Sequence, residues 1–179
     1  MENDLEDLKY PIGRFVPARH YNPDTLASWI GGIRSAPLLF DYCIENLDEA
    51  QLNTPYRPGG WNVIQVVHHV ADSHMNAYVR LKLALTEDTP TISPYEENAW
   101  AELPDVRLVP LNVSVTLLHA LHRRWATLLE NLKEEDWTRT YYHPGNKEHM
   151  PVWQMTNQYS WHGAHHAEQI ISLKKKMGW

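Results

Sequence analysis

The chain has a single cysteine among its 179 residues, Cys43, which excludes a disulfide framework and a thiolate metal cage. This cysteine lies in the apolar run PLLFDYCIENL, and we interpret it as a small buried hydrophobic residue rather than a nucleophile. The sequence also lacks an apolar run of the roughly 18 residues that a membrane span needs, and it does not open with a signal-peptide pattern. We therefore expect a cytoplasmic protein with no membrane partner.

Positive charge is scarce as well, since 16 Lys and Arg face 22 Asp and Glu and the formal net charge is −6. Nucleic-acid-binding proteins usually present a basic surface, so we expect no nucleic-acid partner. The one basic cluster, at 174–176, falls at the end of an expected helix, where positive charge complements the helix dipole. Histidine and tryptophan are abundant by contrast, with eleven and eight residues.

Apolar residues recur at helical spacing in four long segments. Asn22 followed by Pro23 is typical of a helix start, and Asn62 can cap the second helix. We expect Gly31-Gly32 and Pro37 to bend or interrupt the first helix. The four predicted helices cover residues 22–46, 62–85, 112–132 and 151–177.

The long segments between these helices favour a bundle that is not a simple up-and-down arrangement. A proline-containing connection spans 86–111, and TRTYYHPGNKEHM at 138–150 favours a small hairpin around its Pro-Gly pair. YPIGRFVP at 10–17 is expected to be an extended arm packed on the helices. We predict one all-α domain over 1–179, a four-helix bundle with long crossover connections and this N-terminal arm.

The run WHGAHH in the fourth segment places two histidines so that they can bind one ion. At about 100° per residue, His166 falls within the apolar face of the helix and His162 on its flank, whereas His165 points away. His162 and His166 are four residues apart, so their rings lie one turn above each other and can converge on a divalent metal.

A third ligand is expected from a facing helix, and the second segment offers several candidates. His74 lies near the middle of its apolar face, while His68 and His69 flank it on opposite sides, so periodicity alone does not choose between those two. We interpret His74 as a hydrogen-bonded core residue. In the third segment, we interpret His119 and His122 as surface or packing residues.

Several motifs together resemble the YfiT branch of the DinB superfamily over nearly the whole chain: PIGRFVP, TPYRPGGW, QVVHHVADSHMNAYVRLKLALTED, PYEENAWAEL and WHGAHHAEQI. The resemblance implies a four-helix bundle, often a homodimer, with three histidines on one Zn²⁺ or Ni²⁺. The ligand that it implies on the second helix is the histidine directly before the Val-Ala-Asp triplet, His69, and those on the last helix are His162 and His166. Gly163 and Gln169 depart from relatives that can be richer in histidine here.

Relatives of this kind are described as metal-dependent hydrolases, and one branch comprises bacillithiol S-transferases. Three neutral histidines leave a coordination position open, as in catalytic zinc sites, and a metal there can lower the pKa of a bound water toward about 7 or ionise a thiol. We therefore expect a metal-dependent enzyme that attacks a small electrophilic molecule, either a hydrolase or a transferase that uses a thiol cosubstrate. A non-catalytic metal-binding or metal-sensing bundle and a metal-free helical protein are the alternatives.

The surroundings of the predicted metal site include one candidate catalytic residue, Asp72, which lies one turn beyond His69. Its carboxylate could orient a ligand imidazole or hold a proton, and it could equally be a solvated helix residue. Glu168 and Gln169 are weaker candidates for the same role. Tyr56, Arg57 and Trp61 are expected to shape the rim of the site or dimer contacts, or else only a rigid helix entry.

Overall fold

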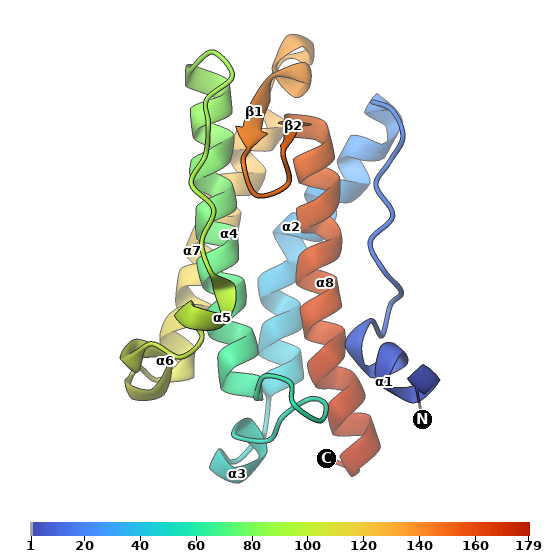
Figure 1. Cartoon of the computed structure of the whole chain (residues 1–179), viewed down its shortest axis with the longest axis vertical. Coiled ribbons are helices and arrows are strands. Elements are labelled where there is room, and N and C mark those ends of the chain that lie inside the picture. The colour runs from blue at the N-terminus through green and yellow to red at the C-terminus, as the bar shows by residue number, and fades with distance from the viewer. Residues whose placement is uncertain (1) are drawn as a thin grey trace.

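The computed structural model describes residues 2–179, which form the predicted all-α four-helix bundle (Figure 1). Each long helix begins and ends within two residues of its predicted bounds. These helices are α2 (Pro23–Ile44), α4 (Val63–Thr86), α7 (Leu111–Glu130) and α8 (Val152–Met177).

Two of the long helices, α2 and α4, begin at a residue whose side chain caps the helix. The side chain of Asn22 accepts a hydrogen bond from the backbone N–H of Asp24, and Asn62 forms a reciprocal capping box with Gln65. Of the bend or interruption predicted for α2, the interruption is wrong, because the helix continues through Pro37 without a break. Tertiary packing of its buried face outweighs the single hydrogen bond that the proline cannot donate.

Two pairs of long helices that follow each other in the chain, α2 with α4 and α7 with α8, do not pack as neighbours in this bundle. Both α2 and α4 pack against α7 and α8, which places α2 and α4 at diagonal corners. α2 and α8 run in one direction, and α4 and α7 in the other (Figure 1). This order requires the predicted crossover: residues 87–110 return beside α4 and include α5 (Glu97–Trp100) and α6 (Pro104–Leu108).

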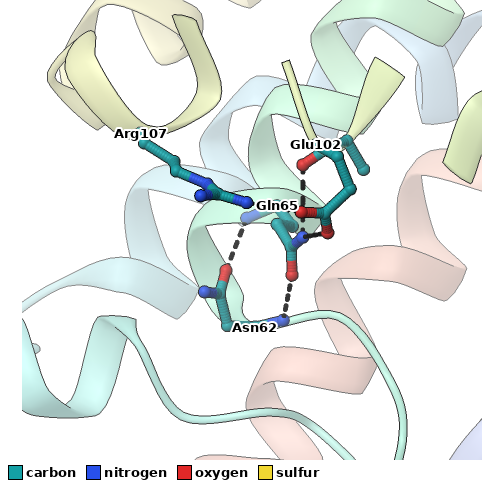
Figure 2. A network of polar contacts seen from close by, with 5 residues as sticks. Asn62, Gln65, Glu102 and Arg107 are labelled. Atoms are coloured by element: carbon teal, nitrogen blue, oxygen red, sulfur yellow. Dashed lines mark hydrogen bonds and ion pairs between the residues drawn. The ribbon is translucent and has the colours of Figure 1, made fainter. Parts of the chain in front are cut away.

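Hydrogen bonds fix the first turn of α4 against this crossover (Figure 2). The amide nitrogen of Gln65 donates to the carbonyl of Ala101 at 3.2 Å and to Glu102 Oε1 at 2.9 Å. Arg107 pairs with the other carboxylate oxygen of Glu102 at 2.5 Å. The capping box and the hydrogen bonds to the crossover therefore both hold the beginning of α4. Together they define the position of the helix turns that follow.

The remaining elements are short. The chain begins with a helix that was not predicted, α1 (Glu2–Lys9). The predicted extended arm comes next and runs alongside α8. There the backbone N–H of Ala18 donates to Asn157 Oδ1 at 3.1 Å, and the Phe15 ring packs on Trp161. The predicted hairpin is confirmed as β1 (Thr140–His143) paired with β2 (Glu148–Pro151), and α3 (Glu49–Leu52) and the 3₁₀ helix η1 (Glu134–Thr138) complete the connections.

Apolar side chains from all four long helices fill the bundle. Trp125, Ile33 and Leu81 are fully buried, and so is Cys43, as the sequence predicted. Burial raises the pKa of the Cys43 thiol to about 12, so it is a poor nucleophile at neutral pH. Within residues 2–179, no helix combines the length and the apolar character that crossing a bilayer requires.

Candidate metal centre

Three histidines from two neighbouring helices converge on one point. His69 comes from α4, and His162 and His166 come from successive turns of α8. One ring nitrogen of each residue lies within 4.8 Å of the others, a separation that lets a single ion touch all three. The structure thus brings together the three residues that the sequence selected as metal ligands.

The protonation of these rings suits metal binding. Burial lowers the pKa of His69 to about 4. Burial, followed by the neighbouring imidazoles, lowers the pKa values of His162 and His166 well below the usual value. All three rings are therefore neutral at pH 7, and each has a nitrogen lone pair to offer a cation without first losing a proton.

Gln169 determines which nitrogen of His166 is free. The Gln169 amide nitrogen donates to the backbone carbonyl of Lys9 at 3.0 Å, which orients the amide. Its oxygen Oε1 lies 2.8 Å from His166 Nδ1, and because that oxygen only accepts, Nδ1 carries the proton. The unprotonated nitrogen of His166 is consequently Nε2, and the hydrogen bond also fixes the ring.

The structure separates the two adjacent histidines that periodicity could not separate. His68 points toward α7, where its Nδ1 lies 2.8 Å from the hydroxyl of Ser114. His69 points toward α8, and its ring centroid lies 5.0 Å from that of His166. The choice of His69, which rested on resemblance, therefore agrees with the geometry.

The structure also places two other histidines, one of them differently from the sequence prediction. His122, expected at the surface or in packing, is a packing residue, since it is 1% exposed and faces His74 across the bundle. His165, expected to point away, is buried and stacks on Trp161 with ring centroids 4.4 Å apart. A signal for His122 existed, because it shares a helical face with Leu118 and Trp125, both of them buried. For His165 no such signal existed, because the arm that covers it comes from the other end of the chain.

The structure does not bring Asp72 to the histidine cluster. Its carboxylate is half-buried and hydrogen-bonds none of the three histidines among the described residues. Burial, followed by the nearby charge of Asp105, raises its pKa to about 6. Asp72 therefore faces the crossover side of α4, and its catalytic role stays a prediction.

A cavity of about 390 Å³ opens beside the three histidines. Its wall includes the turn before α4, where Trp61 packs on His69 with ring centroids 4.6 Å apart. Gly60 allows this turn to fold tightly, because a Cβ there would lie 2.7 Å from Arg57 Cγ. Lys9 and Tyr10 from the N-terminal region and Arg57 also line the cavity. The volume is that of a site for a small molecule.

Comparison with known proteins agrees with this geometry. The sequence profile of the DinB superfamily matches residues 34–170. The chain belongs to the DinB superfamily. This match covers α4 and the part of α8 that together provide all three histidines of the cluster.

Individual DinB relatives are similar to the chain over almost its full length. A Geobacillus thermodenitrificans protein named "Putative metal-dependent hydrolase" is 46% identical, with 98% of each chain covered. A Bacillus cereus protein with the same description is 49% identical, over 98% of this chain and all of that protein. Among solved structures, YfiT from Bacillus subtilis is described as a probable metal-dependent hydrolase with an unusual four-helix bundle topology. It superposes with a TM-score of 0.93 at 43% identity, over 97% of this chain and 99% of that one.

Proposed function

We propose that this chain is a metal-dependent hydrolase whose cavity binds a small electrophilic substrate beside a divalent cation held by His69, His162 and His166. The observation that supports this proposal is the convergence of three neutral imidazoles on one point at the wall of a cavity. The names of the relatives point in the same direction.

The residues present fit a catalytic cation better than a structural one. Structural zinc sites are closed by four protein ligands, whereas this cluster offers three in the part of the chain that the structure describes. A cation held there supplies Lewis acidity, which makes a water molecule or a thiol easier to deprotonate near neutral pH. Imidazole ligands suit Zn²⁺ and Ni²⁺ alike, and we propose Zn²⁺ as the more common occupant.

The protein's own residues shape what can react. Trp61 covers one side of His69 and limits access of bulk water to that ligand. Lys9 and Arg57 line the cavity with positive charge, opposed only by Glu97 among the charged residues of its wall. This balance favours a substrate with a negatively charged group, which the two cations can orient.

The experiment is a paired assay on protein purified without a histidine tag, stripped with a chelator and reloaded with Zn²⁺ or Ni²⁺. One panel contains activated esters and amides, and the other contains model electrophiles with a low-molecular-weight thiol. We expect metal-dependent ester hydrolysis that falls at least 100-fold in His69→Ala. The matched control is His68→Ala, which removes the adjacent buried histidine but leaves the cluster intact.

The two panels separate the possible outcomes. Consumption of thiol without hydrolysis would assign the chain to the transferase alternative and overturn the hydrolase proposal. Inactivity of the metal-loaded protein toward both panels would overturn the enzyme proposal altogether. Metal retention together with such inactivity would favour the binding or sensing alternative.

A further inference from the structure

A line of three histidines, the partly buried His162 and the buried His74 and His122, leads away from the metal centre into the bundle. His162 Nδ1 lies 3.0 Å from His74 Nε2, and His74 Nδ1 lies 2.8 Å from His122 Nε2. At the far end, His122 Nδ1 lies 2.5 Å from the backbone carbonyl oxygen of Ile33 on α2. The line therefore connects α8, α4, α7 and α2, one group from each long helix of the bundle.

The carbonyl at the end of this line is free because of a proline. In a continuous helix, the carbonyl of Ile33 would accept the backbone N–H of residue 37. Residue 37 is Pro37, which has no N–H, so α2 itself leaves this acceptor open in the buried core. His122 satisfies it from the neighbouring helix, which removes the cost of an unpaired buried carbonyl.

The direction of the hydrogen bonds follows from this end alone. A carbonyl oxygen only accepts, so His122 Nδ1 carries the proton and its Nε2 accepts from His74 Nδ1–H. His74 Nε2 is then an acceptor, and it accepts a hydrogen bond from His162 Nδ1–H. Three neutral rings thus provide three protons for three hydrogen bonds, and one lone pair is left over, that of His162 Nε2.

A cation at the His162 end of the line would require the same direction of hydrogen bonds, for a separate reason. If His162 binds a cation through Nε2, its Nδ1 must carry the proton and needs an acceptor. His74 can be that acceptor only if its own proton is on Nδ1, and this in turn requires an acceptor at His122. The carbonyl of Ile33 and a cation at the cluster therefore select one and the same arrangement of protons.

Packing holds the middle ring in place. His74 is fully buried, with the rings of Trp125 and Tyr159 edge-on against it at 5.8 and 5.3 Å between centroids. Gly163 makes room on the side of α8, since a Cβ at that position would lie 3.4 Å from His74 Cε1. The ring has little space in which to turn and offer its other nitrogen.

We propose that His74 and His122 are positioning residues, which set the tautomer and the ring orientation of His162 from the carbonyl that Pro37 leaves free. The inference rests on the proposed role of His162 as a ligand, and it adds that the metal affinity of the site depends on a backbone group on the opposite side of the bundle. Outer partners of metal-binding histidines typically change metal affinity 10- to 100-fold when they are removed.

The first test reads the tautomers directly in the metal-free protein. Long-range ¹H–¹⁵N spectra of the histidine rings distinguish a protonated nitrogen from an unprotonated one. We expect Nδ1–H on His162, His74 and His122 in the wild type. A proton on Nε2 of His74 or of His122 would overturn the proposal, and this measurement needs neither a variant nor a metal.

The second test measures Zn²⁺ affinity by competition with a chromophoric chelator. His74→Phe keeps a buried ring but removes the acceptor for His162, so we expect affinity 10- to 100-fold weaker than in the wild type. His68→Phe is the matched control, because it removes a buried histidine from the same helix together with its hydrogen bond to Ser114. Its affinity should remain within threefold of the wild type.

The outcomes distinguish this inference from the proposed function. Equal affinity of His74→Phe and His68→Phe, with helical circular dichroism intact in both, would contradict the positioning role. If His74→Phe does not fold, the wild-type tautomer spectrum still decides the matter. Tight metal binding without hydrolysis would remove the proposed function and leave the positioning role standing.

Discussion

At the scale of single residues, Gln169 connects the N-terminal region to the candidate metal centre. Its amide oxygen accepts from His166 Nδ1, and its amide nitrogen donates to the carbonyl of Lys9. The same nitrogen lies 3.1 Å from His165 Nε2. One side chain thus orients a ligand ring and holds the end of α1 beside the cavity.

Replacing Gln169 with leucine should weaken metal binding without unfolding the chain. Gln169→Leu leaves His166 Nδ1–H without its acceptor, and we expect Zn²⁺ affinity to fall 10- to 100-fold in the competition assay. Gln158→Leu is the control, since Gln158 lies three turns earlier on α8 and hydrogen-bonds no histidine among the described residues. Affinities of the two variants within threefold of each other would contradict this role for Gln169.

The sequence could predict the ligands only in part, for a reason that lies in helix geometry. The spacing of His162 and His166 is a property of one helix, so phase alone identified the pair. The choice between His68 and His69 depends on which neighbour each flank faces, and that is set by bundle order. Resemblance to the family supplied His69. The hydrogen bond from His122 to Ile33 joins two helices, so the sequence of neither segment alone could predict it.

At the scale of elements, α2 and α8 approach closely where small residues face each other. A Cβ at Gly163 would lie 3.0 Å from the Cβ of Ala36, and one at Gly32 would meet the side chain of Ser160. Gly31, one residue earlier on α2, is exposed and has open space around it. These glycines provide a matched comparison within the same pair of helices.

We expect opposite effects of alanine at Gly163 and Gly31. Gly31→Ala should stabilise the protein by about 0.5–1 kcal/mol, because alanine loses less backbone entropy in a helix. Gly163→Ala makes the same gain but presses on Ala36, whose Cβ moves only with its backbone, so we expect a net loss of about 1–2 kcal/mol. Urea unfolding of both variants measures the difference. A Gly163→Ala protein as stable as the wild type would show that α8 can shift away from α2.

The capping box of α4 gives a second prediction at this scale. Asn62→Ala removes the side-chain acceptor for the backbone N–H of Gln65, which should cost about 1 kcal/mol in the free energy of unfolding. Asn62→Asp keeps an acceptor there and serves as the control. Equal urea midpoints for the two variants would contradict a stabilising role of the cap.

The bounds of the elements were predictable because caps and apolar periodicity are local, as at Asn22 and Asn62. The diagonal arrangement of α2 and α4 was not, since four amphipathic helices can close a core in several orders. Only the length of the 86–111 connection hinted at it. Pro37 misled the prediction, because its local cost was visible while the histidine that uses the freed carbonyl was not.

At the scale of the whole molecule, the buried histidines make the stability of the metal-free protein depend on pH. Burial lowers the pKa of His69 and of His122 to about 4 in the folded state, against about 6.5 when unfolded. Between these values the unfolded chain binds more protons, so stability is full above pH 6.5 and is lost as the pH falls toward 4. Asp72, with its pKa raised to about 6, opposes this trend with a single group.

The expected result is a steep loss of stability in acid. Each such histidine contributes a slope of up to about 1.4 kcal/mol per pH unit, so the urea midpoint of chelator-treated protein should fall markedly from pH 7 to pH 5. Unfolding curves at half-unit intervals measure this dependence. A midpoint that stays constant over that range would mean that the folded and unfolded states bind the same number of protons, and would contradict the lowered histidine pKa values.

The oligomeric state is a further property of the whole molecule that can be measured. The homodimer implied by family resemblance remains a prediction, and light scattering coupled to gel filtration determines the mass in solution directly. The cavity wall described above, from Lys9 to Gln169, comes from one chain.

The burial of Cys43 has a practical consequence for every assay described above. Its thiol is the only one in the chain, it is fully covered, and its raised pKa keeps it protonated at neutral pH. Thiol reagents should therefore react with Cys43 only as fast as unfolding exposes it. The rate of this reaction then measures the rate of unfolding. In tests with added thiols, any loss of sulfhydryl groups beyond that slow background reports on the cosubstrate alone.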